Sequence, residues 1–428
     1  MRSLIALAAL LASGALAESW QWQLDSELAY SPEAVESVSK AEMRLRGDWA
    51  MALSDDVALT LMPELRWDAA DRLRRRDQRP VSDGALNGAV WQNRHAELRV
   101  REAYLDVNLS SLEVRLGKQQ VVWGQADGLR LLDVINPQQL REFNLPTFED
   151  SRIATWMINA ELPLGDDGRL QWLVIPDITV NEQADAGTEF AISSPELRPT
   201  LPQGQPVRAQ PLRRPDRSEV EIGLRYSHFV GGWDLSANYF HFYHDNPVLY
   251  RRQPQGEIVL QPRLERGELL GGSASTAMGN WVLRAEAVYQ QRVYLLRDDL
   301  QDGGVTVSGE LKALLGLDYY GWRDSHLSYQ LFYSRLSDTD RAVVRRRNSL
   351  RHTLSIKRFF YNDTVELQVF ALLNVDHRDG ELRTKLSYQF SDQWRWWLGV
   401  DHFFGRRSGP FGQFHDARRA VVGWQYAF

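Results

Sequence analysis

The chain has 428 residues and a net charge of −6, which is enough for two or three soluble domains or for one large barrel. It contains no cysteine, which excludes thiol catalysis, thiolate metal sites and disulfides, and it has no strongly basic domain of the kind that binds nucleic acid. No apolar run reaches the roughly 18 residues that a membrane-spanning helix needs. The mean hydropathy of −0.41 does not separate a soluble protein from a transmembrane barrel, because half of every barrel strand faces a wet lumen.

The start of the chain has the three parts of a secretory signal peptide. A basic head, Met1-Arg2, precedes an apolar run over residues 4–11, and the small residues Ala15 and Ala17 mark a cleavage site. The apolar run is too short for an anchor helix. The sequence therefore predicts a signal peptide over residues 1–17 and a mature chain that begins at Glu18.

Apolar and polar residues alternate along most of the mature chain, as they do in strands that send successive side chains to opposite faces. The pattern predicts about 18 strands of roughly ten residues, the length that a tilted strand needs to cross a bilayer, with about 16 as the alternative count. Strand 95–109 changes phase, which indicates a bulge near Arg101-Glu102. The strands of the first half are predicted over residues 20–30, 40–53, 56–67, 95–109, 112–123, 152–162 and 168–176.

Residues 418–428 form the clearest of these strands. One face is apolar and ends in three aromatic residues: Ala420, Val422, Trp424, Tyr426 and Phe428. An aromatic stripe of this kind is unfavourable in water, whereas a bilayer holds aromatic side chains at its interface. An edge strand of a soluble protein is the alternative. The stretch resembles the closing strand of bacterial outer-membrane barrels, which commonly ends on a C-terminal Phe.

The connections between the predicted strands alternate in length. Short turns are expected at residues 53–55, 110–111, 231–232, 321–324, 361–363 and 391–392. Long loops are expected at residues 68–94, 124–151, 177–217, 244–265, 296–308, 337–348 and 405–417. The fold class is therefore all-β: a single transmembrane antiparallel β-barrel over residues 18–428, with short periplasmic turns and long extracellular loops.

Loop 124–151 is too apolar for a solvated loop, because the leucines and other aliphatic residues of 129–135 need a surface to pack on. Two interpretations remain open: a constriction or plug folded into the lumen, or a hydrophobic lid over the outer rim. In the first case the segment would present the residues Trp123, Gln125, Asp127, Arg130, Asp133, Asn136 and Arg141.

Loop 177–217 is rich in Pro and Arg. Its prolines disfavour a regular strand, and it is interpreted as a mobile surface loop rather than as a gate over or in the pore. Arginines cluster in two other outer loops, at residues 72–79 and 341–347. Their guanidinium groups could hold the phosphates of lipopolysaccharide, or they could be solvated loop tips.

A family resemblance rests on two runs. Residues 116–124 read Leu-Gly-Lys-Gln-Gln-Val-Val-Trp-Gly, and residues 133–137 read Asp-Val-Ile-Asn-Pro. Together they resemble an uncharacterised family of proteobacterial outer-membrane barrels with a Gly-Arg-Gln-x-Val-x-Trp-Gly segment followed by Val-Ile-Asn-Pro, although Lys118 replaces the Arg here. A more distant resemblance is to the alginate-export porins. The family implies an envelope channel, or a transport partner of inner-membrane exporters of hydrophobic molecules, and it implies no settled substrate.

Basic residues prevail among the predicted inward-facing side chains of the last five strands. The predicted pore-lining residues are Arg351, Lys357, Arg383, Lys385, Arg395 and Arg419, with Glu366 and Asp401 as the acids. Rings of Arg and Lys favour anions, although pairing with acids across the lumen would cancel that effect. The leading hypothesis is an outer-membrane channel or transporter for small or polymeric solutes, anions among them. The alternatives are a plugged barrel that moves hydrophobic molecules and a structural partner of an envelope export complex.

An outer-membrane enzyme is the least favoured function. The run His241-Phe242-Tyr243-His244-Asp245 is the best catalytic candidate, but no His-Glu-x-x-His or Gly-x-Ser-x-Gly motif accompanies it. No catalytic site, cofactor or metal is expected. The expected partners are outer-membrane lipid, lipopolysaccharide and envelope export proteins, with no nucleic acid, and the expected location is the outer membrane of a Gram-negative bacterium.

Overall fold

A computed structural model of the chain describes residues 18–428, except 34–36, 71–83, 85, 203 and 217. The predicted signal peptide and the arginine cluster at 72–79 lie outside the described residues. The barrel wall consists of β1 (Glu18–Tyr30), β2 (Val38–Ser54), β3 (Val57–Asp68), β5 (Ala96–Leu109), β6 (Leu112–Gln119), β8 (Thr155–Leu164), β9 (Gly168–Ile175), β12 (Glu221–Val230), β13 (Trp233–Tyr243), β16 (Arg266–Met278), β17 (Trp281–Leu296), β18 (Val305–Tyr319), β19 (Ser325–Leu336), β20 (Asn348–Phe360), β21 (Val365–Asn374), β22 (Asp379–Gln389), β23 (Trp394–Phe404) and β24 (Arg419–Ala427).

These strands form a closed antiparallel barrel of 18 strands, which confirms the predicted fold and the higher of the two strand counts. Each strand pairs with the next one in the chain, and β24 pairs with β1, where Trp424 lies opposite Ser26. The backbones of Trp22 and Phe428 exchange two hydrogen bonds of 2.8 and 2.9 Å across this seam. Closure leaves no wall strand with an unpaired edge, as a strand in lipid requires.

The outer face carries the apolar residues that the alternation predicted. On the last two strands Trp396, Leu398 and Val422 are exposed, and the rings of Trp394 and Tyr426 lie 4.6 Å apart. The predicted bulge is confirmed: Arg101 is skipped in the pairing of β3 with β5, which shifts register beside Pro63. Proline lacks the N–H that a regular ladder would use, so the bulge accommodates it.

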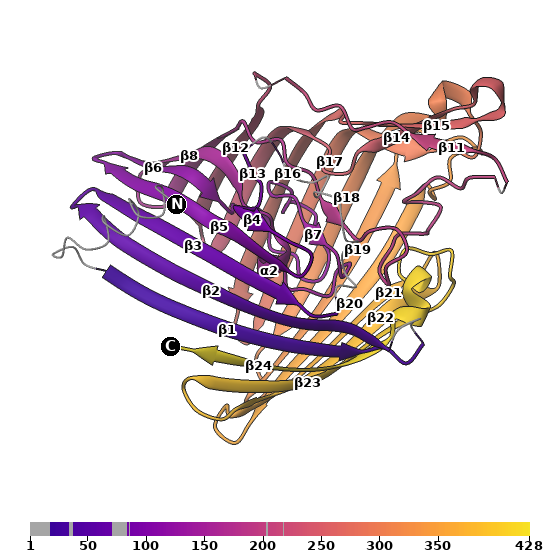
Figure 1. Cartoon of the computed structure of the whole chain (residues 1–428). Coiled ribbons are helices and arrows are strands. Elements are labelled where there is room, and N and C mark those ends of the chain that lie inside the picture. Colours follow the sequence, from indigo (N-terminus) through magenta and orange to yellow (C-terminus); the bar gives the residue numbers. More distant parts are fainter. Residues whose placement is uncertain (1–17, 34–36, 71–83, 85, 203, 217) are drawn as a thin grey trace.

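Short turns and long loops gather at opposite ends of the barrel, called here the turn end and the loop end (Figure 1). The loop end also has two short connections, 31–37 and 375–378, which the sequence pattern did not single out. Several loops contain secondary structure of their own: β4 (Trp91–Gln92), β7 (Gln139–Leu140), α2 (Phe148–Ser151), β10 (Glu182–Gln183), β11 (Val207–Ala209), β14 (Val248–Arg252), η1 (Pro254–Gly256), β15 (Ile258–Arg263), η2 (Gln301–Gly303) and η3 (Gly412–Ala417).

The elements within the loops lie in two different places. The small sheet of β11, β14 and β15 projects beyond the wall strands at the loop end (Figure 1). By contrast, β7 and α2 lie between the barrel walls (Figure 1). They belong to the connection between β6 and β8, residues 120–154, called here the inserted segment. Among the described residues, no helix is long and apolar enough to cross a membrane.

Candidate functional site

The inserted segment leaves the wall at Trp123-Gly124. The Trp123 side chain is fully buried, and its Nε1–H donates to Gln171 Oε1 at 2.8 Å. Gly124 has a φ of +84°, which side-chain-bearing residues rarely adopt. A Cβ at this position would lie 2.9 Å from Leu132 Cβ and 2.9 Å from a carboxylate oxygen of Glu286. A glycine is therefore required where the chain turns from the wall into the lumen.

Beyond this turn the segment packs on one side of the lumen. Leu131, Leu132 and Ile135 are buried against inward-facing residues of β8, β9, β13 and β16 to β19, called here the packed wall: Met157, Leu173, Ile175, Phe240, Phe242, Leu269, Val288, Leu314 and Phe332. Complete burial of one such side chain stabilises by about 1.5–3 kcal/mol. The apolar residues of 129–135 thus pack inside the barrel and do not cover the outer rim.

Polar groups of the packed wall bind the backbone of the segment. The Glu286 carboxylate accepts hydrogen bonds from the N–H groups of Gln125 and Leu132. The Asp127 carboxylate pairs with Arg284 at 3.0 Å, and the Asp127 N–H donates to Gln330 Oε1 at 3.0 Å. These contacts fix a turn that has no regular secondary structure to satisfy its donors.

Other predicted constriction residues make contacts within the inserted segment. The Asn136 side chain accepts from the Val121 N–H at 2.7 Å and donates to the Ile153 carbonyl at 3.1 Å, so it joins the two ends of the segment. Asp133 pairs with Arg152 at 2.7 Å and with Arg130 at 3.3 Å. Asp133 and Arg130 are therefore engaged within the segment.

The opposite side of the lumen is the inner face of β1 to β3 and β20 to β24, called here the charged wall. Glu142 of the segment is buried between Lys40 Nζ, at 2.8 Å, and Arg419 Nη1, at 2.6 Å. Burial opposes ionisation of Glu142, but the two cations outweigh it and hold the pKa of this carboxyl well below its ordinary value. A charged carboxylate thus fastens the segment across the lumen.

A second carboxylate of the segment makes the same kind of contact. The Thr147 hydroxyl caps α2 by accepting from the Asp150 N–H at 3.1 Å. The Asp150 carboxylate pairs with Arg46 at 2.7 Å and Arg101 at 3.3 Å. Burial raises its pKa, but Arg44, Arg46 and Arg101 together lower it below the ordinary value. Neither Glu142 nor Asp150 was singled out from the sequence, because nothing in a loop pattern shows which bases a carboxylate will meet.

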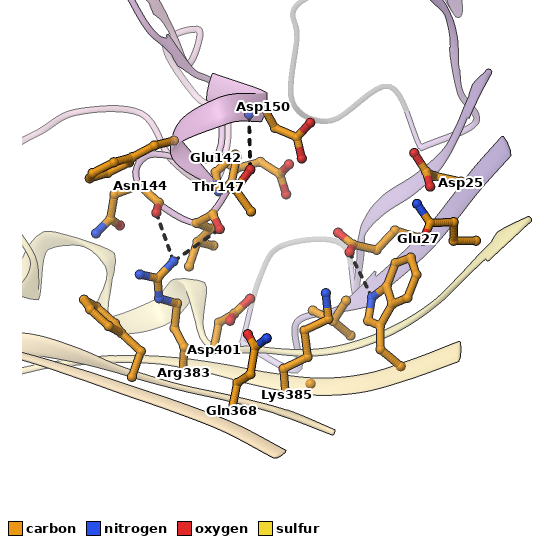
Figure 2. Close-up of a pocket in the computed structure, with 18 of the residues that line it drawn as sticks. Asp25, Glu27, Glu142, Asn144, Thr147, Asp150, Gln368, Arg383, Lys385 and Asp401 are labelled. Carbon is orange, nitrogen blue, oxygen red and sulfur yellow. Dashed lines mark hydrogen bonds between the residues drawn. The ribbon is translucent and has the colours of Figure 1, made fainter. Parts of the chain in front are cut away.

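A cavity of about 740 Å³ separates the segment from the charged wall. Figure 2 shows Glu142, Asn144 and Thr147 on one side of it and Arg383, Lys385, Gln368 and Asp401 on the other. Ten basic and eight acidic side chains line it: Lys40, Arg44, Arg46, Arg66, Arg141, Lys357, Arg383, Lys385, Arg395 and Arg419, with Asp25, Glu27, Glu42, Glu64, Asp127, Glu142, Asp150 and Asp401. This cavity therefore lies to one side of the lumen, and its lining is strongly polar.

The predicted pore-lining residues fall into two groups. Lys357, Lys385, Arg383, Arg395, Arg419 and Asp401 line the cavity, whereas Arg351 and Glu366 do not. Most of the lining arginines already have partners: Arg419 pairs with Asp401 at 2.8 Å as well as with Glu142, and Arg395 pairs with Glu366. Arg383 donates to the carbonyl oxygens of Asn144 and Leu145 at 3.1 and 3.2 Å (Figure 2). The excess of basic charge expected from the sequence is thus largely neutralised.

The connection between β9 and β12, residues 176–220, reaches across the loop end. Phe190 is buried in an aromatic cluster with Phe143 of the inserted segment and with Phe403, Phe411 and Phe414. Glu196 accepts a hydrogen bond from His377 at 2.9 Å. The loop is therefore packed against the loop end of the barrel and is not a free surface loop. Burial of Phe190 holds it there although the residues around Phe190 have the composition of a solvated loop.

The possible catalytic run lies at the loop end of β13. His241 shares the outward register with Tyr239 and lies 3.6 Å from Glu268. His244 is on a different side of the strand end, where its Nε2 is 2.8 Å from the Arg292 carbonyl. The two histidines therefore do not converge on one site.

A family model matches residues 65–337, well over half of the chain, and its description is "Protein of unknown function (DUF1302)". The chain belongs to this family. The matched DUF1302 region includes the inserted segment and the packed wall. No curated protein matches the sequence.

Solved structures similar to this DUF1302 chain are outer-membrane barrels. OmpT of Vibrio cholerae, folded in vitro, has 10% sequence identity and a TM-score of 0.45, with 98% of this chain and 99% of that chain covered. A mutant of the Rh. blastica porin has 12% identity and a TM-score of 0.43, with 96% and 100% covered. Identities this low say nothing about function.

Proposed function

We propose that the protein is a restricted outer-membrane channel for small polar solutes. The observation that carries this proposal is the cavity of about 740 Å³ between the inserted segment and the charged wall. An 18-stranded barrel is wide enough for an aqueous lumen, and here the segment occupies one side of that lumen. Solutes that pass would therefore have to follow the charged wall.

The chemistry of the lining supports a polar solute. The apolar residues of the segment are buried against the packed wall, so they offer no surface to a hydrophobic molecule. The cavity lining has two more basic than acidic side chains, which favours anions over cations. The loop end faces outward and the turn end faces the periplasm in this proposal, as in bacterial barrels with long outer loops.

Single-channel conductance of the refolded full-length protein in a planar bilayer, under an ion gradient, tests the proposal. We expect small, stable conductance steps with a modest preference for anions. A matched measurement on Arg383→Glu with Lys385→Glu should move the reversal potential toward cations. A folded barrel that conducts no ions, or a reversal potential unaffected by the charge change, would contradict the proposed role.

A further inference from the structure

Two lysines stand in one row of the charged wall. In the ladders of β20, β21 and β22, Lys357 lies opposite Gln368, and Gln368 lies opposite Lys385. All three side chains line the cavity. Opposite residues of neighbouring strands have Cβ atoms about 4.5–5.5 Å apart, so two strand spacings separate the lysines by roughly 10 Å. Both flexible ammonium groups can therefore reach the same small ligand.

The charges on either side of this row are already neutralised. Toward the loop end, Arg419 pairs with Asp401 at 2.8 Å, and toward the turn end Arg395 pairs with Glu366. Lys357 and Lys385, by contrast, form no ion pair with any residue in the described part of the chain, and both are exposed to the lumen. These two ammonium groups are the part of the basic wall that remains available to a solute.

An aromatic ring and a glycine lie beside Lys385 on β23, on the side away from Lys357. The Lys385 ammonium lies 4.5 Å from the centre of the Trp397 ring, which also lines the cavity. The residue opposite Lys385 on β23 is Gly399, so the wall has no side chain there. The row thus has two cations two strand spacings apart with the neutral Gln368 between them, an arrangement that fits a ligand with two separated negative groups better than one compact inorganic anion.

We propose that this row binds a small organic dianion, with one carboxylate on Lys357, the other on Lys385 and the carbon chain over Gln368 between them. This inference rests on the proposed channel function and specifies the class of solute. Across the cavity, Glu142 and Asp150 are each paired with bases of the barrel wall. Beside Lys385, Glu27 accepts from the Trp397 Nε1–H at 3.2 Å and is paired with Lys40 at 2.8 Å, so its charge is also compensated. The ligand would bind in the lumen water beside the inserted segment.

The test uses adipate as the dianion, hexanoate as a monoanion of similar length and adipamide as the neutral analogue. Each is added to the full-length protein during single-channel recording. We expect adipate to reduce the current at a lower concentration than hexanoate, and adipamide to have no effect. Lys357→Gln with Lys385→Gln should raise the half-blocking concentration of adipate by at least about ten-fold, since each ammonium contributes a charged hydrogen bond.

Arg358→Gln is the matched control, because it removes one positive charge from the neighbouring residue, which the strand alternation places on the opposite face of β20. It should leave adipate block unchanged. Equal block by adipate and hexanoate, or undiminished block in the double lysine variant, would overturn the inference while the channel proposal stood. If the folded protein passes no current, the channel proposal fails, and calorimetric titration with adipate then decides the inference by itself: absence of lysine-dependent heat refutes it.

Discussion

The packed wall and the charged wall enclose the same lumen but hold the inserted segment by different physical means. On the packed wall, aliphatic and aromatic side chains of the wall and of the segment are buried against one another. On the charged wall, the segment is held by a few carboxylates, and a cavity of about 740 Å³ remains between the contacts. Apolar packing is non-directional and favours contact over the whole surface, whereas ion pairs are local. The comparison teaches that continuous apolar packing anchors the segment on one side, whereas separate ion pairs on the other side leave a cavity beside it.

The largest expected effect comes from removing the segment from both walls. Replacing residues 125–150 with a short Gly-Ser linker should raise single-channel conductance roughly several-fold, toward that of an unobstructed 18-stranded barrel. The control is replacement of the β14–β15 hairpin, which projects beyond the wall strands (Figure 1). An unchanged conductance in the segment variant would show that the segment does not set the bore.

The packed wall is tested by Trp123→Ala. The side chain is fully buried, so the variant should lose about 3–5 kcal/mol in the free energy of unfolding. Denaturant titration of the protein in detergent micelles measures this change. Trp172→Ala, at an outward position that is 37% exposed, serves as the control and should cost less. Equal losses at the two positions would argue against packing as the main anchor.

The charged wall is tested by Glu142→Gln, which leaves Lys40 and Arg419 without their shared carboxylate. Breaking a buried ion pair in this way costs about 3–5 kcal/mol, but here the loss should be smaller, because Arg419 keeps Asp401. We expect more frequent open-channel fluctuations with little change in the unfolding of the barrel. Glu161→Gln, which disrupts an exposed pair with Arg169, should leave the recordings as in the unaltered protein.

Acid should have the same effect as Glu142→Gln. Because the folded-state pKa of Glu142 lies below the ordinary value of 4.5, its contribution is fully present above that pH and is lost as the pH falls through the lowered pKa. Fluctuations of the unaltered channel should therefore increase in strong acid. The Glu142→Gln variant should show a weaker acid response, and an identical response would assign the effect to other carboxyls such as Asp150.

The smallest effect concerns the loop packed against the loop end. The hydrogen bond that His377 donates to the Glu196 carboxylate raises the pKa of His377 above its ordinary value of 6.5, so this contact contributes fully below that pH and is lost as the pH rises through the raised pKa. Cleavage after Leu197, which is exposed beside Glu196, by chymotrypsin should accelerate slightly at alkaline pH, after correction for the pH dependence of chymotrypsin. His377→Gln should abolish that increase, and a persistent increase would refute the assignment.

The barrel wall could be predicted from the sequence because a period of two is a local property of each strand. Even the bulge at Arg101 is visible as a change of phase. The inserted segment also had a local signal, since leucines in a loop need a partner surface. The packed wall could also have been recognised, because Phe240 and Phe242 are apolar residues at positions of β13 that face the lumen. A search for apolar residues on the outward face alone passes over them.

The contacts across the lumen could not be predicted in the same way. Glu142 meets Lys40 and Arg419, which are 102 and 277 residues away in the chain. No periodicity links a loop carboxylate to bases on distant strands. From the sequence alone, Arg419 is therefore predicted to line the pore, and its pairing with Glu142 becomes visible only in the folded structure. Arg383 is similar, because its partners are backbone carbonyls that any sequence would offer.

The two ends of the inserted segment emerge from strands that are direct neighbours, where Gln119 lies opposite Thr155. The wall is therefore already continuous beneath the segment, and the barrel does not depend on it for closure. If the protein is the channel proposed here, lengthening, shortening or exchanging this one connection would alter which solutes pass and leave the barrel wall intact. Related sequences can therefore differ in this connection, and so in permeability, while they keep the same barrel.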